Sequence, residues 1–153
     1  MQRLDPRVGV VWGLAAVVAA LIVGAVATGI ALFLIDWPLW TGAAVGAVVL
    51  VVGLGYAALR YRIWRYEVQA DALYLERGVL TRVRTVVPYV RIQHVDTQRD
   101  PLERIVGIGS VVIYTAGSRG ADVSIPGLDP ERATALQQRL RSLIGESDAE
   151  DAV

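Results

Sequence analysis

Residues 8–59 read VGVVWGLAAVVAALIVGAVATGIALFLIDWPLWTGAAVGAVVLVVGLGYAAL, and this stretch decides the fold. Its one charged residue, Asp36, divides it into uncharged runs of 28 residues (Val8–Ile35) and 23 residues (Trp37–Leu59). About 20 apolar residues cross the hydrocarbon core of a bilayer as a helix, so each run is long enough by itself. Ile35-Asp36-Trp37-Pro38 combines a charge, an indole and a helix breaker, as a turn at a membrane surface does. The stretch therefore predicts a transmembrane hairpin with helices over about 8–35 and 38–59.

Basic residues flank both outer ends of this hairpin: Arg3 and Arg7 before it, and Arg60, Arg62 and Arg65 after it. Short arginine-rich flanks stay in the cytoplasm. We therefore expect a multi-pass protein of the plasma membrane with both termini cytoplasmic. The tryptophans are expected to form interfacial belts, with Trp12 and Trp64 at the inner surface and Trp37 and Trp40 at the outer one.

A cleaved signal peptide is the alternative for the first run, because Ala25-Val26-Ala27 has the small residues of a cleavage site. Signal peptides have apolar regions of only about 7–15 residues, and this run is longer and continues through Ile35. Gly9-x-x-x-Gly13 and Gly42-x-x-x-Gly46 have the spacing of closely packed transmembrane helices, and we expect both pairs to pack within the hairpin. Neither span contains a charged residue that could serve a proton or ion pathway, which argues against a transporter.

The remaining chain divides by composition into three parts. We expect a short cytoplasmic amino-terminal segment (1–7), a folded cytoplasmic domain (60–145) and a flexible acidic tail (146–153). From Arg60 to Ile144 the chain has 13 arginines and nine acidic residues, a net charge of +4, whereas the tail has four acids and no base. The sequence contains no Cys, Lys or Asn. Thiolate nucleophiles, Cys-based zinc sites, Schiff-base lysines and N-glycosylation are thereby excluded.

Beyond Arg60 the hydrophobic period changes to the alternation of half-buried strands. Strands are predicted over 64–68, 73–77, 82–87, 92–97, 111–114 and 122–125, with a loop over 116–120, and with Ile92, His94 and Asp96 on one face. Asp100-Pro101-Leu102-Glu103 predicts a capped helix start, and Gly107 its end. A second helix is predicted from the Asp129 cap and Pro130 to Gly145, with the apolar stripe Ala133, Leu136, Leu140, Leu143 and Ile144. The pattern is an α+β domain of about six or seven antiparallel strands, a barrel or sandwich closed by a carboxy-terminal helix.

The segment Trp64–Ile144 resembles the bacterial pleckstrin-homology-like (bPH2, DUF304) domain of small membrane proteins of the YdbS type. The resemblance is carried by Val87-Pro-Tyr-Val-Arg-Ile-Gln-His-Val-Asp, Asp100-Pro-Leu-Glu-Arg-Ile-Val-Gly-Ile-Gly and Ile125-Pro-Gly-Leu, with Tyr66-Glu-Val and Leu75-Glu-Arg-Gly-Val. The two preceding spans match the arrangement of that family. The resemblance implies a PH-like barrel on the cytoplasmic face with no catalytic role, and no phosphoinositide pocket.

Three features have both a chemical and a structural interpretation. Gly107-Ile108-Gly109 is similar to part of a dinucleotide-binding loop, but the third glycine is missing and a helix end explains it. His94 and Asp96 could touch as an acid–base pair, although no nucleophile or metal partner accompanies them. Asp100 and Glu103, which with Asp96 could suggest a metal site, are explained by helix capping. We therefore assign no catalytic, cofactor-binding or metal residue.

The sequence favours a non-enzymatic integral membrane protein that presents a PH-like domain to a second membrane protein or to copies of itself. No nucleic-acid partner, cofactor or small-molecule substrate is indicated. The alternative is a module that senses anionic lipid. Its candidate headgroup contacts are Arg60, Arg62, Arg65, Arg82 and Arg84, because each cation near an anionic leaflet contributes about 1 kcal/mol.

Overall fold

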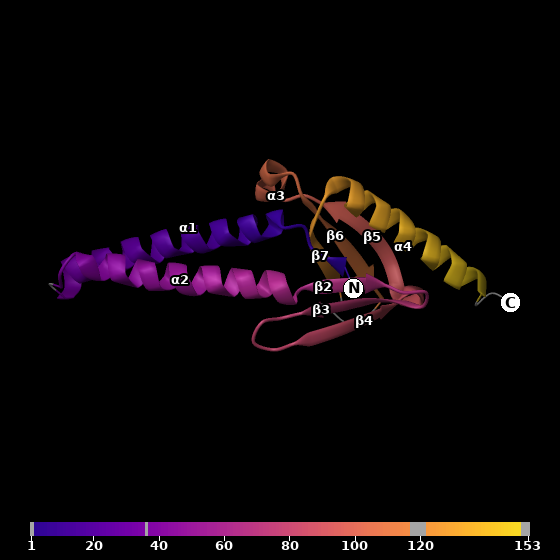
Figure 1. Cartoon of the computed structure of the whole chain (residues 1–153), viewed down its shortest axis with the longest axis horizontal. Helices are drawn as coiled ribbons and strands as arrows, with labels where there is room; N and C mark the ends of the chain where they lie inside the picture. The colour runs from indigo at the N-terminus through magenta and orange to yellow at the C-terminus, as the bar shows by residue number, and fades with distance from the viewer. Residues whose placement is uncertain (1, 36, 117–121, 151–153) are drawn as a thin grey trace. The chain divides into compact units, whose positions relative to one another are not determined.

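The computed structural model describes residues 2–35, 37–116 and 122–150 of the chain (Figure 1). The chain forms two compact units, Gly9–Arg62 and a second in which Met1–Val8 joins Ile63–Val153. The first unit is a helical hairpin, and the second holds two antiparallel sheets of four and three strands and a carboxy-terminal helix. The predicted class, a membrane hairpin with an α+β domain of about six or seven short strands, is confirmed.

The hairpin consists of α1 (Arg7–Ile30), the π-helical turn η1 (Ala31–Ile35) and α2 (Trp40–Ile63). The helical runs Arg7–Phe33 and Trp40–Ile63, of 27 and 24 residues, are each long and apolar enough to cross a membrane. Helix α2 continues past the predicted boundary at Leu59, because the next four residues contain neither glycine nor proline. The predicted turn charge, Asp36, lies outside the described residues.

Small residues bring the two helices of the hairpin into close contact. A Cβ atom at Gly42 would lie 2.8 Å from Cα of Thr28, and one at Gly46 would lie 3.2 Å from the carbonyl oxygen of Ala20. Backbones approach this closely only where side chains are small. The Gly42–Gly46 pair therefore packs within the hairpin, as predicted. Of the other predicted pair, a Cβ atom at Gly13 would lie 3.7 Å from the Leu54 side chain, but one at Gly9 would meet nothing within 4 Å.

The four-stranded sheet has the order β1-β2-β3-β4, and its first strand comes from before the transmembrane segment. Strand β1 pairs antiparallel with β2, so that Gln2 lies opposite Tyr66 and Arg3 lies opposite Arg65. The strands are β1 (Gln2–Arg3), β2 (Arg65–Val68), β3 (Ala72–Arg77) and β4 (Val83–Pro88).

The amino-terminal segment is also fastened to the second sheet. Leu4 and Val8 are 3% and 1% exposed, and the Asp5 N–H donates to the carbonyl of Gly127 at 2.8 Å. Gly127 has a φ of +64°, and a Cβ atom there would lie 2.7 and 2.9 Å from the two methyl groups of Val8. Glycine at 127 therefore provides both an αL conformation and the space that Val8 occupies.

The second sheet has the order β5-β6-β7, with α3 (Pro101–Val106) between β5 and β6. Its strands are β5 (Ile92–Gln98), β6 (Gly109–Thr115) and β7 (Val123–Leu128). A register irregularity between Ile92 and His94 changes the alternation of β5, so that Ile92 is buried and His94 is exposed. The predicted common face of Ile92, His94 and Asp96 is wrong for Ile92. The predicted loop over 116–120 lies largely outside the described residues.

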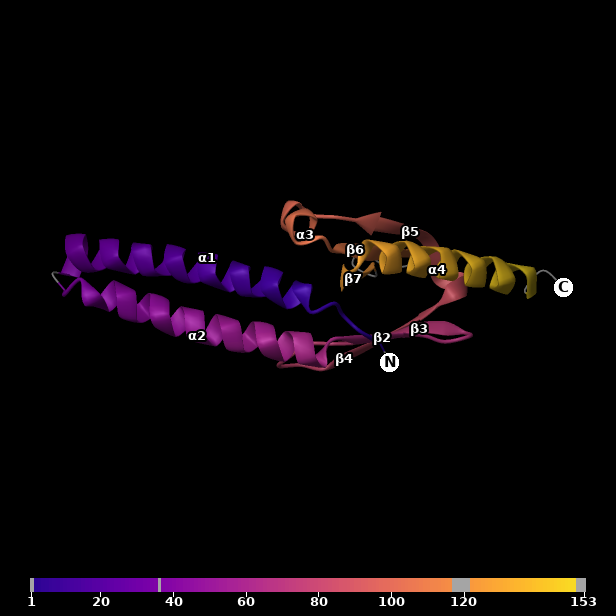
Figure 2. The same ribbon diagram turned by 45° about the horizontal axis from the view of Figure 1, so that its top comes forward.

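Helix α4 (Pro130–Glu150) covers the second sheet, in contact with β5, β6 and the 3₁₀ turn η2 (Tyr89–Arg91). Figure 2 shows the two sheets as separate layers, with α4 beside the β5-β6-β7 layer. The predicted stripe is confirmed, since Ala133, Leu136, Leu140 and Leu143 are buried and Ile144 is half-buried. The prediction that Gly145 ends the helix is wrong, because a glycine inside a helix costs only about 1 kcal/mol relative to alanine and no proline follows.

One predicted interfacial tryptophan is instead a core residue. Trp64 directly precedes β2 and is only 4% exposed. Other large side chains of the same domain, such as Tyr66 and Leu73, are buried as well. Its assignment to the inner belt is therefore wrong, and a buried strand flank explains the indole.

Candidate functional site

Two of the predicted lipid-contacting arginines lie in one row across the first sheet. Arg65 on β2 is opposite Glu76 on β3, and Glu76 is opposite Arg84 on β4. The Arg84 Nε atom lies 3.5 Å from Glu76 Oε1, and the side chains are 78% and 15% exposed. Because directly opposite residues share a face, Arg65 and Arg84 flank one anion in this row, and Arg3 extends it beside Arg65. The sheet thus brings Arg65 and Arg84 together, with part of their charge compensated.

Arg82 lies in the turn between β3 and β4, where Gly78 has a φ of +99°. The turn also presents Leu80, which is 95% exposed. Arg82 is itself exposed, and in the described part of the chain it makes no salt bridge. It is a cation beside an exposed apolar side chain.

The other two predicted arginines, Arg60 and Arg62, lie in the last turn of α2. The Arg60 guanidinium carbon lies 4.1 Å from the centroid of the Trp12 ring, a cation–π contact within the hairpin. Such a contact contributes about 0.5–1 kcal/mol at an exposed site. Arg62 is exposed. Headgroup contact by all five arginines remains a prediction.

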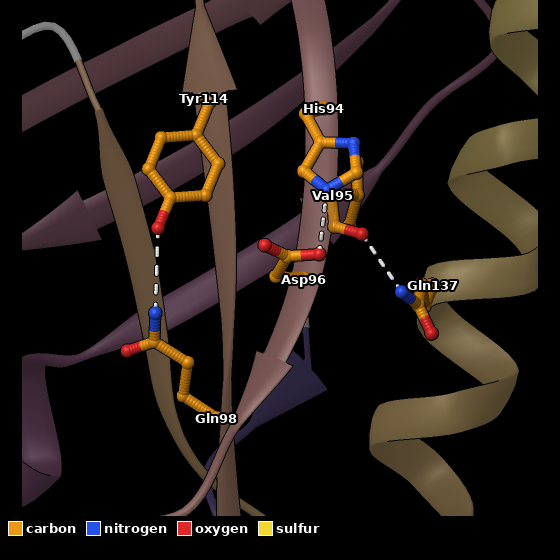
Figure 3. A network of polar contacts seen from close by, with 6 residues as sticks. All are labelled: His94, Val95, Asp96, Gln98, Tyr114 and Gln137. Carbon is orange, nitrogen blue, oxygen red and sulfur yellow. Dashed lines mark hydrogen bonds and ion pairs between the residues drawn. The ribbon is translucent and has the colours of Figure 1, made fainter.

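His94 and Asp96 do touch, as the β5 spacing predicts (Figure 3). The His94 Nε2 and Asp96 Oδ1 atoms are 2.7 Å apart, and the side chains are 59% and 42% exposed. The neighbouring polar contacts are structural: Gln98 Nε2 donates to the Tyr114 hydroxyl at 3.3 Å, and Gln137 Nε2 donates to the Val95 carbonyl at 2.7 Å. The second of these ties α4 to the middle of β5. The His94–Asp96 pair itself lies open to solvent on the strand surface.

The carboxylates considered for a metal site form a capping box instead. Asp100 caps α3, and Glu103 Oε2 accepts from the Asp100 N–H at 3.2 Å. The other oxygen of Glu103 accepts from the Ser110 hydroxyl at 2.7 Å, and Glu103 is 7% exposed. One oxygen of this carboxylate thus caps α3, and the other joins α3 to β6. Among the described residues, no group of three His, Cys, Asp or Glu side chains could hold a metal ion.

Gly107 ends α3 as predicted, in a left-handed conformation with a φ of 77°, and its N–H bonds to the Glu103 carbonyl. Gly109 then begins β6, so the glycine pair connects a helix to a strand. A dinucleotide loop has the reverse order, a strand followed by a helix. The structural interpretation of Gly107-Ile108-Gly109 is therefore confirmed.

Tyr89 connects η2 to the first sheet through a buried hydroxyl. This hydroxyl lies 2.5 Å from the Gln69 carbonyl oxygen and 3.2 Å from that of Ala72. Burial raises the pKa of Tyr89, nearby Asp71 raises it further, and Arg139 acts in the opposite direction. The contact joins η2 to β3 of the first sheet and to the residue that follows β2.

Sequence reasoning missed the free edge of the first sheet. Strand β4 is the last strand in its sheet, and in the described residues no other strand pairs with its outer side. Val83 and Val86 on this strand are 41% and 50% exposed. An edge strand with exposed β-branched side chains is a template for pairing with another chain. The alternation of residues 82–87 indicated a strand but could not indicate that it would be an edge.

Comparison with known proteins agrees with this architecture. The family model described as "Bacterial PH domain" matches residues 8–144 of the chain. The UPF0699 transmembrane protein YdbS of Bacillus subtilis (strain 168) is 31% identical over 153 aligned residues, which cover 96% of this chain and 94% of the relative. No solved structure matches the chain significantly.

Proposed function

Because the chain belongs to the bacterial PH domain family and is a YdbS-like membrane protein, we propose that it acts without catalysis. In this proposal two transmembrane helices hold the PH-like domain at the cytoplasmic surface of the plasma membrane. There the domain binds a second membrane protein or further copies of itself. The observation that carries the proposal is the free edge of β4, with its exposed Val83 and Val86.

The proposed topology is supported by the path of the amino-terminal segment. Gln2 and Arg3 pair with β2, and Asp5 bonds to Gly127, so the segments before and after the hairpin form one folded unit. Two segments of one domain lie on the same side of a bilayer. The arginines that flank the hairpin on both ends favour the cytoplasmic side.

The absence of catalysis is supported by the roles of the candidate groups. Glu103 has both oxygens engaged in helix capping and in the Ser110 contact. His94 and Asp96 are a solvated pair on an exposed strand face. A hydrolase or transferase activity of the purified protein that is lost on His94→Ala would contradict this part of the proposal.

The β4 edge gives the protein-binding part its test. We expect Val86→Glu to weaken partner binding or self-assembly, because a carboxylate replaces an apolar side chain of the pairing surface. Val90→Glu is the matched control, since Val90 is 57% exposed but lies in η2 rather than on the edge strand. The full chain is purified in mild detergent, and light scattering and mass spectrometry measure its assembly and its co-purifying proteins.

A complex that persists in the Val90→Glu variant and is lost in the Val86→Glu variant supports the proposal. A monomer that co-purifies with no second membrane protein contradicts it. A complex that is indifferent to Val86→Glu excludes the β4 edge as the contact. The molecular mass of the purified particle, measured for each variant, distinguishes these three outcomes.

The second candidate function, anionic-lipid sensing, is favoured by the stacking of Arg60 on Trp12 at 4.1 Å, with Arg62 exposed nearby in sequence. Full-length protein in nanodiscs with and without anionic lipid tests it. Sensing predicts that hydrogen exchange in the domain depends on anionic lipid, and that this dependence weakens with salt and with Arg60→Gln/Arg62→Gln. Indifference to lipid charge removes this candidate.

A further inference from the structure

A cavity of about 770 Å³ lies within the domain, between strands β1 and β2 on one side and helix α4 on the other. Its apolar floor includes Leu4, Val68 and Leu136. Tyr66 from β2 and Arg132 and Arg139 from α4 also line it. The cavity therefore combines an apolar floor with two arginines from helix α4.

The spacing on α4 places the two arginines on the cavity side. Arg132 and Arg139 are seven residues apart, which is about two helical turns, or roughly 10 Å. Leu136 lies between them on the same face and is 8% exposed. Arg139 and Arg132 thus stand at the two ends of an apolar strip. Arg141, also on α4, is exposed and does not line the cavity.

The cationic charge of this cavity is not neutralised within the described part of the chain. None of the lining residues is acidic, and Arg132 and Arg139 form no salt bridge there. Arginine remains protonated at any accessible pH. Arg3 also lines the cavity, but its register opposite Arg65 places it on the other face of the sheet from Tyr66, so we do not count its charge.

Tyr66 provides a second, independent observation. The residue is 4% exposed overall, and its hydroxyl makes no hydrogen bond to another described residue. Because no fully buried polar side-chain atom among the described residues lacks a partner, this hydroxyl is open to the cavity that the residue lines. Burial raises the pKa of Tyr66, and the positive charge of Arg132 acts in the opposite direction. A neutral hydroxyl donor next to an arginine would suit an oxygen atom of an anion.

We infer that this cavity binds a phosphate ester, with its phosphate held by Arg132 or Arg139 together with the Tyr66 hydroxyl and its apolar part lying on Leu136. A phosphate monoester carries a charge of about −1.5 to −2 near pH 7, which matches the two uncompensated arginines. Guanidinium groups bind phosphate oxygens in bidentate geometry. The inference does not depend on the β4 edge. The ester is either a free small molecule or the headgroup of a lipid, and the two sources are distinguished by experiment.

The experiment uses the full chain in nonionic detergent and follows binding by calorimetry. Phenyl phosphate represents a free ester, and dihexanoyl phosphatidic acid represents a lipid headgroup. We expect saturable binding of at least one probe, weakened about 10-fold or more by Arg132→Gln or Arg139→Gln, because hydrogen bonds to charged groups are the strong ones. Tyr66→Phe, which removes only the hydroxyl, should weaken binding several-fold. Arg141→Gln is the matched control and should bind as the parent does.

Binding of phenyl phosphate assigns the site to free esters, and binding of the short-chain lipid alone assigns it to headgroups. The inference is overturned if neither probe saturates by about 10 mM, a concentration at which even weak sites fill. It is also overturned if both arginine variants bind normally, or if Arg141→Gln loses as much affinity as they do. Unchanged circular dichroism in the variants excludes unfolding as the cause of a loss.

Discussion

The attachment of the amino-terminal segment depends on Gly127, and replacing it with alanine should detach this segment. A non-glycine residue in the left-handed conformation costs about 1–2 kcal/mol. The new methyl group would also overlap with Val8, whose own methyl groups would lie 2.7 and 2.9 Å away, in a site where Val8 is 1% exposed. Overpacking of this kind costs about 1–3 kcal/mol. The structure thus predicts a loss of roughly 2–5 kcal/mol in the free energy of opening for Gly127→Ala.

Hydrogen–deuterium exchange of the full chain in nonionic detergent measures this loss. The Asp5 amide reports on it directly, because it donates to the Gly127 carbonyl at 2.8 Å. Gly145→Ala is the control: a Cβ atom there would meet no described atom within 4 Å, and the residue lies inside α4. Alanine at that position should stabilise the helix by about 0.5–1 kcal/mol.

The two glycine substitutions should therefore have opposite signs. Val8→Ala in the Gly127→Ala background should recover part of the loss, since it removes the methyl groups that overlap. The reasoning is refuted if Gly127→Ala leaves the exchange of Asp5 unchanged. It is also refuted if Gly145→Ala destabilises the chain by a similar amount.

Three further perturbations test other contacts. Glu103→Ala should lower the unfolding free energy by about 1–3 kcal/mol, measured by chemical denaturation, because it leaves the Ser110 hydroxyl and a helix amide without their acceptor. Tyr89→Phe should lower the unfolding free energy by about 1 kcal/mol. Because burial raises the folded pKa of Tyr89, the neutral hydroxyl stabilises the parent protein below about pH 10, and this contribution is lost as pH rises through the folded pKa. The variant should therefore lack this alkaline loss of stability. Because the chain has no cysteine, single cysteines at Leu39 and Ala70 report topology: an impermeant maleimide added to intact cells should label Leu39→Cys and spare Ala70→Cys, and the reverse pattern would contradict cytoplasmic termini.

Much of the fold is local and was therefore predictable. The two apolar runs, the Asp100 capping box and the stripe of α4 are each encoded within a few consecutive turns. The strand over 64–68 was also visible, but whether Trp64 faces lipid or a core depends on which segment packs over it. Gly145 shows the limit of local signals, since a glycine ends a helix only when its surroundings make another conformation better.

The non-local features could not be predicted in this way. Nothing in Gln2-Arg3 indicates a strand, because two residues have no period. Its partner β2 begins only after the whole transmembrane hairpin. The cavity beside Tyr66 likewise brings together α4 and β2. These two elements are far apart in the sequence, so no local pattern of residues predicts that they share a cavity. The His94–Asp96 contact was predictable because both residues lie on one strand, two positions apart.

The order of synthesis gives the β1–β2 pairing and the Asp5–Gly127 bond a further meaning. Asp5 leaves the ribosome 122 residues before its partner Gly127, which corresponds to roughly 6–24 s of translation at typical rates. During that interval both hydrophobic helices are made and must find the bilayer. A chain whose second helix fails to cross has its first strand on one side of the membrane and the remaining strands on the other, so its sheet cannot close. Completion of the domain would then act as a proofreading step for membrane insertion, with misinserted chains left as unfolded substrates for proteases.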